Sequence, residues 1–316
     1  MFRFKTPQRV IEIGGIRFGG QPGENPTVLL GTMFYNGHKI IESRKRCRFD
    51  KKRAEELLNR QETLSEQTGV PGMVDIVANF PDEIRGYIDF VTSVSDMPFS
   101  TDIWKVKPKL AAARYVKEVG LVDRYLYNSI APWSEDIERE TKELSTIGIK
   151  NALLVAFNIQ DKTPEGRIKI LEGLLIPNAE KAGVENMLVD TSVLNVPSTA
   201  FSIIGGLRIK VAFGLPVGCA PSNGTDMWKV PRERWEKVGF AGVDSAAHAV
   251  TSLYNDFLLY GPIESAPWIF PAIATVNSIL ATFAFDESGV LPSGSKHPLN
   301  LLFPDFVAEL RKEDNK

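Results

Sequence analysis

Polar side chains follow several apolar segments of this chain, and they are its candidates for chemistry. Asp102, Asn128, Asn158 and Asp190 each stand directly after a predicted buried strand, and Asn223 lies in a later polar loop. A carboxylate binds two adjacent N–H donors strongly because hydrogen bonds to a charged acceptor exceed neutral ones, and an asparagine amide both donates and accepts. The set favours recognition of a flat heterocycle such as a pterin, whose 2-amino group and N3–H form such an edge.

Each residue taken alone has a simpler interpretation. A single aspartate after a strand often caps the next helix, and a loop rich in glycine and proline is often only a turn. The recurrence of the pattern at successive strand ends favours a shared site. We expect the loop from Gly214 to Asn223 to follow a strand, with a preceding helix that starts at Pro197 and ends near Gly205-Gly206. Gly214 is therefore also assigned to the pterin site.

Eight apolar segments alternate with helix signals along the chain, which predicts a (β/α)8 TIM barrel, with its functional residues at the carboxyl ends of the strands. The predicted strands are Thr27–Met33, Gly72–Val77, Pro98–Thr101, Asp123–Tyr127, Asn151–Phe157, Met187–Val189, Ile209–Phe213 and Asp256–Tyr260. The alternative is an open doubly wound sheet, but no Gly-x-Gly-x-x-Gly follows the first strand. We expect one domain over residues 1–316, with an N-terminal β-hairpin and linker over 1–26 and a tail over 296–316.

Composition excludes several classes of function. The net charge of −2 implies neither nucleic acid nor an anionic membrane as partner. The two cysteines, Cys47 and Cys219, and the three histidines show no metal-ligand spacing, so no metal site is expected and a reducing cytoplasm is the expected location. No signal peptide is recognisable, and no apolar run reaches the ~18 residues of a membrane span.

Several motifs resemble the H subunit of tetrahydromethanopterin S-methyltransferase, over almost the whole chain. They are Gly19-Gly20-Gln21-Pro22-Gly23-Glu24-Asn25-Pro26-Thr27-Val28-Leu29, Leu57-Leu58-Asn59-Arg60-Gln61-Glu62, Tyr127-Asn128-Ser129-Ile130 and Gly218-Cys219-Ala220-Pro221. The stretch Asp102-Ile103-Trp104-Lys105 and the loop ending at Trp228 make the chain most similar to the bacterial methylcorrinoid:tetrahydrofolate methyltransferases of glycine betaine demethylation.

The resemblance implies transfer of a methyl group from a methylcobalamin-type corrinoid to N5 of tetrahydrofolate. It places pterin contacts on Asp102, Asn128 and Asp190, and Asn223 is the candidate for the contact with N5. The corrinoid is expected on a separate protein because no Asp-x-His-x-x-Gly motif occurs. A cytoplasmic homodimer without membrane insertion is expected.

Three alternatives remain open. One is a tetrahydromethanopterin-specific subunit of a larger membrane-associated complex, and another is a non-catalytic subunit. The third is dihydropteroate synthase, which needs basic residues at the ends of strands seven and eight, where this chain has Gly214-Leu215-Pro216 and Gly261-Pro262-Ile263.

Aromatic side chains are expected around the mouth of the barrel. Trp104, Trp133 and Trp228 fall in loops at the predicted carboxyl ends of the strands, and Tyr35 and His38 follow the first strand. Such a rim suits pterin stacking or docking of a partner, although semi-exposed aromatics are also common on ordinary surfaces.

Overall fold

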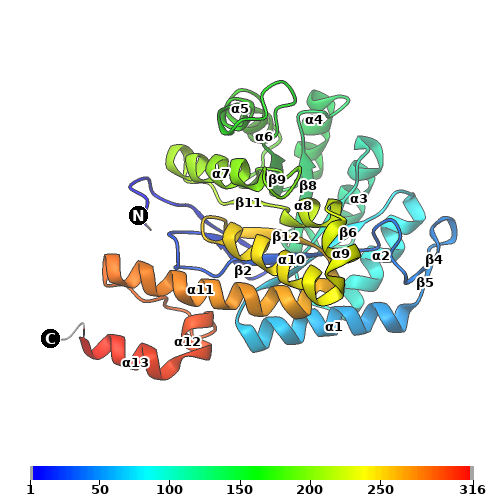
Figure 1. Ribbon diagram of the computed structural model, residues 1–316. Helices are drawn as coiled ribbons and strands as arrows, with labels where there is room; N and C mark the ends of the chain where they lie inside the picture. Colours follow the sequence, from blue (N-terminus) through cyan, green and yellow to red (C-terminus); the bar gives the residue numbers. More distant parts are fainter. Residues whose placement is uncertain (1–2, 314–316) are drawn as a thin grey trace.

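Short segments rich in valine, leucine and isoleucine form the central sheet of the molecule, since strands buried on both faces need continuous apolar sequence. In this computed structural model, which describes residues 3–313, eight parallel strands close into a barrel in chain order (Figure 1). The strands are β3 (Val28–Met33), β6 (Gly72–Val77), β7 (Phe99–Asp102), β8 (Tyr125–Ile130), β9 (Asn151–Val155), β10 (Asn186–Asp190), β11 (Val217–Cys219) and β12 (Phe257–Pro262). The predicted (β/α)8 barrel is confirmed.

Helices surround the barrel and link its strands. They are α1 (Lys51–Thr68), α2 (Pro81–Val94), α3 (Val106–Glu118), α4 (Ile137–Ile147), α5 (Pro164–Ile170), α6 (Ile176–Lys181), α7 (Thr199–Phe213), α8 (Pro221–Met227), α9 (Val230–Arg234), α10 (Glu236–Ser252) and α11 (Ala266–Ser288), followed by α12 (Pro298–Leu302) and α13 (Pro304–Glu313). Local sequence sets their ends. The Asp50 carboxylate accepts the N–H of Arg53 at 2.9 Å to begin α1, and Gly69 ends it at a φ of 72°.

The predicted N-terminal hairpin is present and closes one end of the barrel. It consists of β1 (Val10–Ile13) and β2 (Ile16–Gly19), paired antiparallel. Ile13 and Phe18 are fully buried and pack against barrel residues such as Leu30 and Leu188. A second antiparallel pair, β4 (Ile41–Ser43) with β5 (Arg48–Phe49), lies in the segment that joins β3 to α1.

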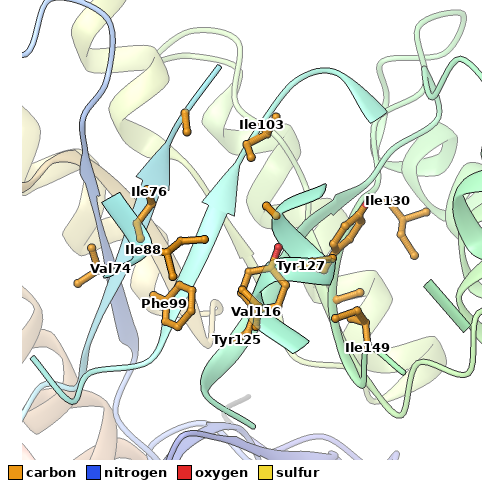
Figure 2. Packing of buried hydrophobic residues seen from close by; sticks show 14 of the residues in the cluster. Val74, Ile76, Ile88, Phe99, Ile103, Val116, Tyr125, Tyr127, Ile130 and Ile149 are labelled. Atoms are coloured by element: carbon orange, nitrogen blue, oxygen red, sulfur yellow. The ribbon is translucent and has the colours of Figure 1, made fainter. Parts of the chain in front are cut away.

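The larger part of the core lies between the strands and the outer helices. Figure 2 shows Phe99 and Tyr125 from neighbouring strands packed near Ile88 of α2 and Val116 of α3. These side chains have no measurable exposure. This packing fixes the strands relative to the helices, so the strand ends at the mouth are rigid supports for functional groups.

The seventh strand is not where the sequence predicted it. Ile209–Phe213 belongs to α7, and β11 is the shorter segment Val217–Cys219. The Gly205-Gly206 pair does not end the helix but serves packing inside it. A Cβ on Gly205 would lie 2.7 Å from Cδ of Arg167, and one on Gly206 would lie 3.3 Å from Cγ2 of Val217. Close approach, rather than chain termination, explains the glycines.

One helix meets the length and composition of a membrane span, contrary to the sequence-based expectation. It covers Ile263–Ser288, and 44% of its most apolar window is buried against the rest of the protein. The helix contacts α1, α10 and α12 (Figure 1). Core helices of soluble proteins pass the same test, so a single such helix is weak evidence for a membrane span. The last three residues of the predicted tail and the first two of the N-terminal segment lie outside the described residues.

Candidate functional site

The barrel opens at the carboxyl ends of its strands into a cavity of about 530 Å³. Four of the side chains selected from the sequence line it: Asp102 at the end of β7, Asn128 in β8, Asp190 at the end of β10 and Asn223 in the first turn of α8. Four polar groups from separate parts of the sequence therefore share one space. A cavity of this size suits a small heterocycle.

Asp75 is a further acid in the cavity, and the sequence-based interpretation missed it. It lies within β6 and is 1% exposed. Its Oδ1 accepts hydrogen bonds from Oγ of Ser100 at 2.5 Å and Nδ2 of Asn128 at 3.2 Å. The available signal was an acid in the middle of an otherwise apolar strand, since charged residues are rarely buried without a partner or a function.

Burial raises the proton affinity of the carboxylates, and for Asp102 the neighbouring negative charges add to this effect. Burial is the main cause that raises the pKa of Asp75, against hydrogen bonds from Ser100, Asn128 and Thr32. Enclosure by the protein, together with the charge of Asp75, raises the pKa of Asp102 to about 7, although Lys109 opposes this and the Asp102 side chain faces the open cavity. The free site therefore holds protons near neutral pH, and its hydrogen-bonding character changes in the physiological range.

Lys109 is the one cationic side chain among the described residues that line the cavity. Its Nζ lies 2.8 Å from Oε1 of the fully buried Glu140 and donates to the carbonyl of Ser129. Glu140 also accepts from the hydroxyls of Tyr127 and Ser134, each at 2.5 Å. This network fixes the chain directly after Asn128 and thereby the position of its amide.

Asp190 is held by its own turn. The backbone N–H of Ser192 donates to Oδ1 of Asp190 at 2.7 Å, and Ser192 has a φ of 53°. Burial raises the pKa of Asp190 to about 6, while the Ser192 hydrogen bond and the charge of Arg167 lower it. At pH 7 Asp190 is mainly ionised, so it can accept two N–H donors from a ligand.

Asn223 is presented by helix α8, which begins at Pro221 directly after β11. The buried carboxylate of Asp244 anchors this helix from behind, because it accepts from the Thr225 hydroxyl at 2.7 Å and from Nε1 of Trp268 at 2.9 Å. Asp226, one turn after Asn223, also lines the cavity. The predicted loop is therefore a short anchored helix.

Two residues assigned from the sequence lie elsewhere. Asn158 is not among the lining residues, and its Oδ1 accepts from the backbone N–H groups of Gln160 and Asp161, so it shapes a turn. Gly214 ends α7 with a φ of 63°, and its carbonyl accepts from the N–H of Arg9 at 2.8 Å. Its placement at the cavity followed from the misplaced seventh strand and is wrong.

Aromatic side chains flank the cavity. Trp104 and Trp133 line it with their rings stacked at 5.6 Å, and Trp104 is 73% exposed. Tyr35 follows β3, also lines the cavity, and stacks on the buried His38 with the ring centroids 4.4 Å apart. Trp228 packs edge-on against another tryptophan and is not among the lining residues.

Tyr35 and His38 meet one carboxylate. Nε2 of His38 lies 3.1 Å from Oε1 of Glu264, and the Tyr35 hydroxyl donates to the same oxygen at 3.3 Å. Burial would raise the pKa of Glu264, but these contacts outweigh it and lower the pKa. The described residues contain no group of three or more histidine, cysteine or acidic side chains arranged to hold a metal ion.

Comparison with known families identifies the chain. The family model described as "Tetrahydromethanopterin S-methyltransferase MtrH subunit" matches residues 6–292. The chain belongs to this family. Similar members include the H subunit of tetrahydromethanopterin S-methyltransferase from Methanopyrus kandleri, 36% identical over 93% of this chain and 97% of that protein. The H subunit of the putative methyltransferase mtx from Methanosarcina barkeri is 37% identical over 96% of this chain and 100% of its own length.

Solved structures with the same fold include dihydropteroate synthases. That of Xanthomonas albilineans, in complex with indole-2-carboxylic acid and 6-chloroguanine, has a TM-score of 0.59 and 14% identity, over 87% of this chain and 99% of that one. The enzyme of Yersinia pestis, with a sulfonamide drug complex, has a TM-score of 0.59 and 12% identity, over 86% and 98%. At such low identity the likeness shows the fold alone.

Proposed function

We propose that this protein transfers a methyl group from a methylated corrinoid, carried by a separate protein, to N5 of tetrahydrofolate, as a step in glycine betaine demethylation. The proposal that the acceptor is a pterin rests on one observation, which is that Asp75, Asp102, Asp190 and Asn128 line the same cavity. Membership of a family whose named members are methyltransferase subunits supports the reaction class.

The residues of the cavity have distinct proposed roles. Asp190, mainly ionised at pH 7, accepts the 2-amino and N3 hydrogens of the pterin, with Asp102 and Asn128 beside it. Asn223 holds N5 without adding charge near the reacting nitrogen. The corrinoid supplies the carbon–cobalt bond from which the methyl group leaves. When N5 gains the methyl group it loses its proton, and a water molecule held by the amides of the cavity can carry that proton away.

The stacked Trp104–Trp133 pair, in which Trp104 is exposed, supports a place for the corrinoid partner. An accessible aromatic surface beside an open cavity is suited to bury part of a second protein. The methyl donor would then meet N5 from the open side while the pterin occupies the deeper acid-lined part. Holding both reactants in line is the main contribution that the protein makes to such a transfer.

A second candidate has its own support. The relatives named as H subunits of tetrahydromethanopterin S-methyltransferase favour tetrahydromethanopterin as the methyl acceptor and a multi-subunit complex as the setting. Dihydropteroate synthase is less favoured because the ends of β11 and β12 present Ala220, Ser222 and Gly261 to the cavity and no basic side chain.

The proposed location is the cytoplasm, with no insertion into the membrane.

A homodimer is also proposed. Apolar side chains are exposed on α11, on α12 and around the start of α13, and we name them together the α11–α13 surface: Ile279, Leu301, Leu302, Phe303 and Phe306, each 39–49% exposed. These helices contact one another at one edge of the barrel (Figure 1). Residues 266–285 contain no charged side chain. Burial of this surface against a second copy would remove apolar area from water, and twofold pairs are the commonest soluble assembly.

The test uses purified protein with methylcobalamin as the methyl donor and either tetrahydrofolate or tetrahydromethanopterin as the acceptor. We expect 5-methyltetrahydrofolate to form only when the corrinoid is added, and cobalt analysis to show no metal in the protein as purified. If methylcobalamin methylates tetrahydromethanopterin but not tetrahydrofolate, the second candidate is favoured. Turnover without any corrinoid, or stoichiometric cobalt, would contradict the mechanism.

A further inference from the structure

Arg167 lies behind the cavity and is 1% exposed. It belongs to α5, and its guanidinium donates to four backbone carbonyls in two separate segments. Nε donates to Thr191 at 2.7 Å and Nη2 to Ser192 at 3.4 Å, while Nη1 donates to Lys162 at 2.5 Å and Thr163 at 3.1 Å. One side chain therefore ties the start of α5 to the turn that follows β10.

The buried guanidinium has an unusual electrostatic setting. No carboxylate of the described residues makes an ion pair with Arg167 within 4.0 Å. Burial of a cation without a carboxylate partner is costly. Burial lowers the pKa of Arg167, and the largest opposing effect is the charge of Asp190. The charges of Arg167 and Asp190 therefore stabilise each other without direct contact.

The turn that Arg167 holds is the one that orients Asp190. Ser192 has the left-handed φ of 53°, which a residue with a side chain adopts only when its surroundings enforce it. In that conformation its N–H reaches Oδ1 of Asp190. The Ser202 hydroxyl and Arg167 both donate to the Ser192 carbonyl. The chain on the two sides of Ser192 is thus fixed to α5 and α7.

Space for Arg167 is provided by another helix. Gly205 of α7 lies against its side chain, and any Cβ there would lie 2.7 Å from Cδ of Arg167. The other groups whose charge acts on or near Asp190 are the Asp102 carboxyl from β7 and the Cys219 thiol from β11. Neither is cationic, so Arg167 is the positive group of this set.

We propose that Arg167 is a positioning residue, which fixes the turn from Asp190 to Ser192 and supplies the positive charge that keeps Asp190 a hydrogen-bond acceptor for the substrate. This inference rests on the proposed function for the role of Asp190, but its electrostatic part concerns the ligand-free protein. Arg167 would act through Asp190 and would not touch the pterin.

The experiment compares Arg167→Met, which removes the charge and the hydrogen bonds, with Arg167→Lys, which keeps the charge. The exposed Arg139→Met on α4 is the matched control. Carbon-13 NMR of the aspartate carboxyls follows the titration of Asp190 in each ligand-free protein, with assignment from Asp190→Asn. Calorimetry measures tetrahydrofolate binding from pH 5.5 to 8.5.

For Arg167→Met we expect the titration of Asp190 to move up by at least one pH unit. Tetrahydrofolate affinity at pH 6.5 should then fall at least about threefold, because the ionised fraction of Asp190 falls by that factor. The affinity loss should shrink at pH 8.5, where Asp190 is ionised without help. Arg167→Lys should keep most of the wild-type titration. Unchanged titration in Arg167→Met, or an affinity loss of equal size at every pH, would overturn the proposal.

Two further measurements keep the outcomes separate. If Arg167→Met does not fold, Arg167→Lys and Gly205→Ala, which displaces the guanidinium without changing its charge, are titrated instead. An unmoved Asp190 titration and unchanged tetrahydrofolate affinity in Gly205→Ala would then refute the positioning role, with Arg167→Lys as the variant that keeps the charge. Failure of wild-type protein to bind any tetrahydropterin would refute the proposed function, whereas the ligand-free titration would still test the electrostatic link.

Discussion

Replacement of Asp190 by asparagine should stabilise the protein while it weakens substrate binding. Burial raises the pKa of Asp190 from 3.8 to about 6. Because the folded pKa lies above the unfolded one, the contribution of this group to stability is fully present below pH ~4 and is lost as the pH rises through about 6. At pH 8 the ionised carboxylate therefore opposes folding.

The size of the effect follows from the pKa. Each unit corresponds to about 1.4 kcal/mol, so the rise costs about 3 kcal/mol of unfolding free energy at pH 8. Asp190 is only half-buried, and solvent screening reduces this figure to about 1–3 kcal/mol. Asparagine keeps the shape and an oxygen that can accept from Ser192, so most of this cost should be recovered. At pH 5 about half of the gain should remain.

Thermal or urea unfolding of wild-type protein and Asp190→Asn at pH 5 and pH 8 measures the gain. The exposed Asp286→Asn on α11 is the control and should show no comparable dependence on pH. Calorimetry should show at least a tenfold loss of tetrahydrofolate affinity, about 1.4 kcal/mol, since a buried charged acceptor is replaced. A variant less stable than wild type at pH 8, or a gain of equal size at both pH values, would refute the reasoning.

Three other outcomes are expected. Tetrahydrofolate affinity should fall as the pH drops from 8 to 5.5, because Asp190, with a pKa of about 6, and Asp102, with one of about 7, become protonated, and a flat calorimetric profile would contradict this. In thermal unfolding, Gly205→Ala should lower the midpoint temperature because its new Cβ clashes with Arg167. Gly242→Ala, which has open space around its Cβ, should raise the midpoint slightly, because alanine adds up to about 1 kcal/mol of helix propensity to the free energy of unfolding. Ile279→Lys should convert the proposed dimer to a 35.1 kDa monomer in light scattering, and a wild-type monomer at the same concentration would refute the dimer.

The sequence alone determined the barrel and much of the cavity. Continuous apolar segments, helix caps and glycine stops are local signals, because strand burial and helix termination depend on residues close in the chain. Asp102, Asn128 and Asp190 could be predicted in the same way, since they stand in or at the ends of strands that the sequence makes recognisable. In a parallel barrel all such ends meet at one mouth, so position along the chain was enough to group them.

Only the tertiary structure decided the rest. Residues 209–213 are apolar enough for a strand, but the Gly205-Gly206 pair allows α7 to pack against Arg167 and Val217, and the helix continues to Phe213. Asp75 was not predicted because it lies within an otherwise apolar strand. The role of Arg167 depends on hydrogen bonds to backbone carbonyls more than 20 residues away in the sequence. Close approach of helices, burial of charge and contacts between distant segments leave no periodic trace in the sequence, because each depends on partners that folding alone brings together.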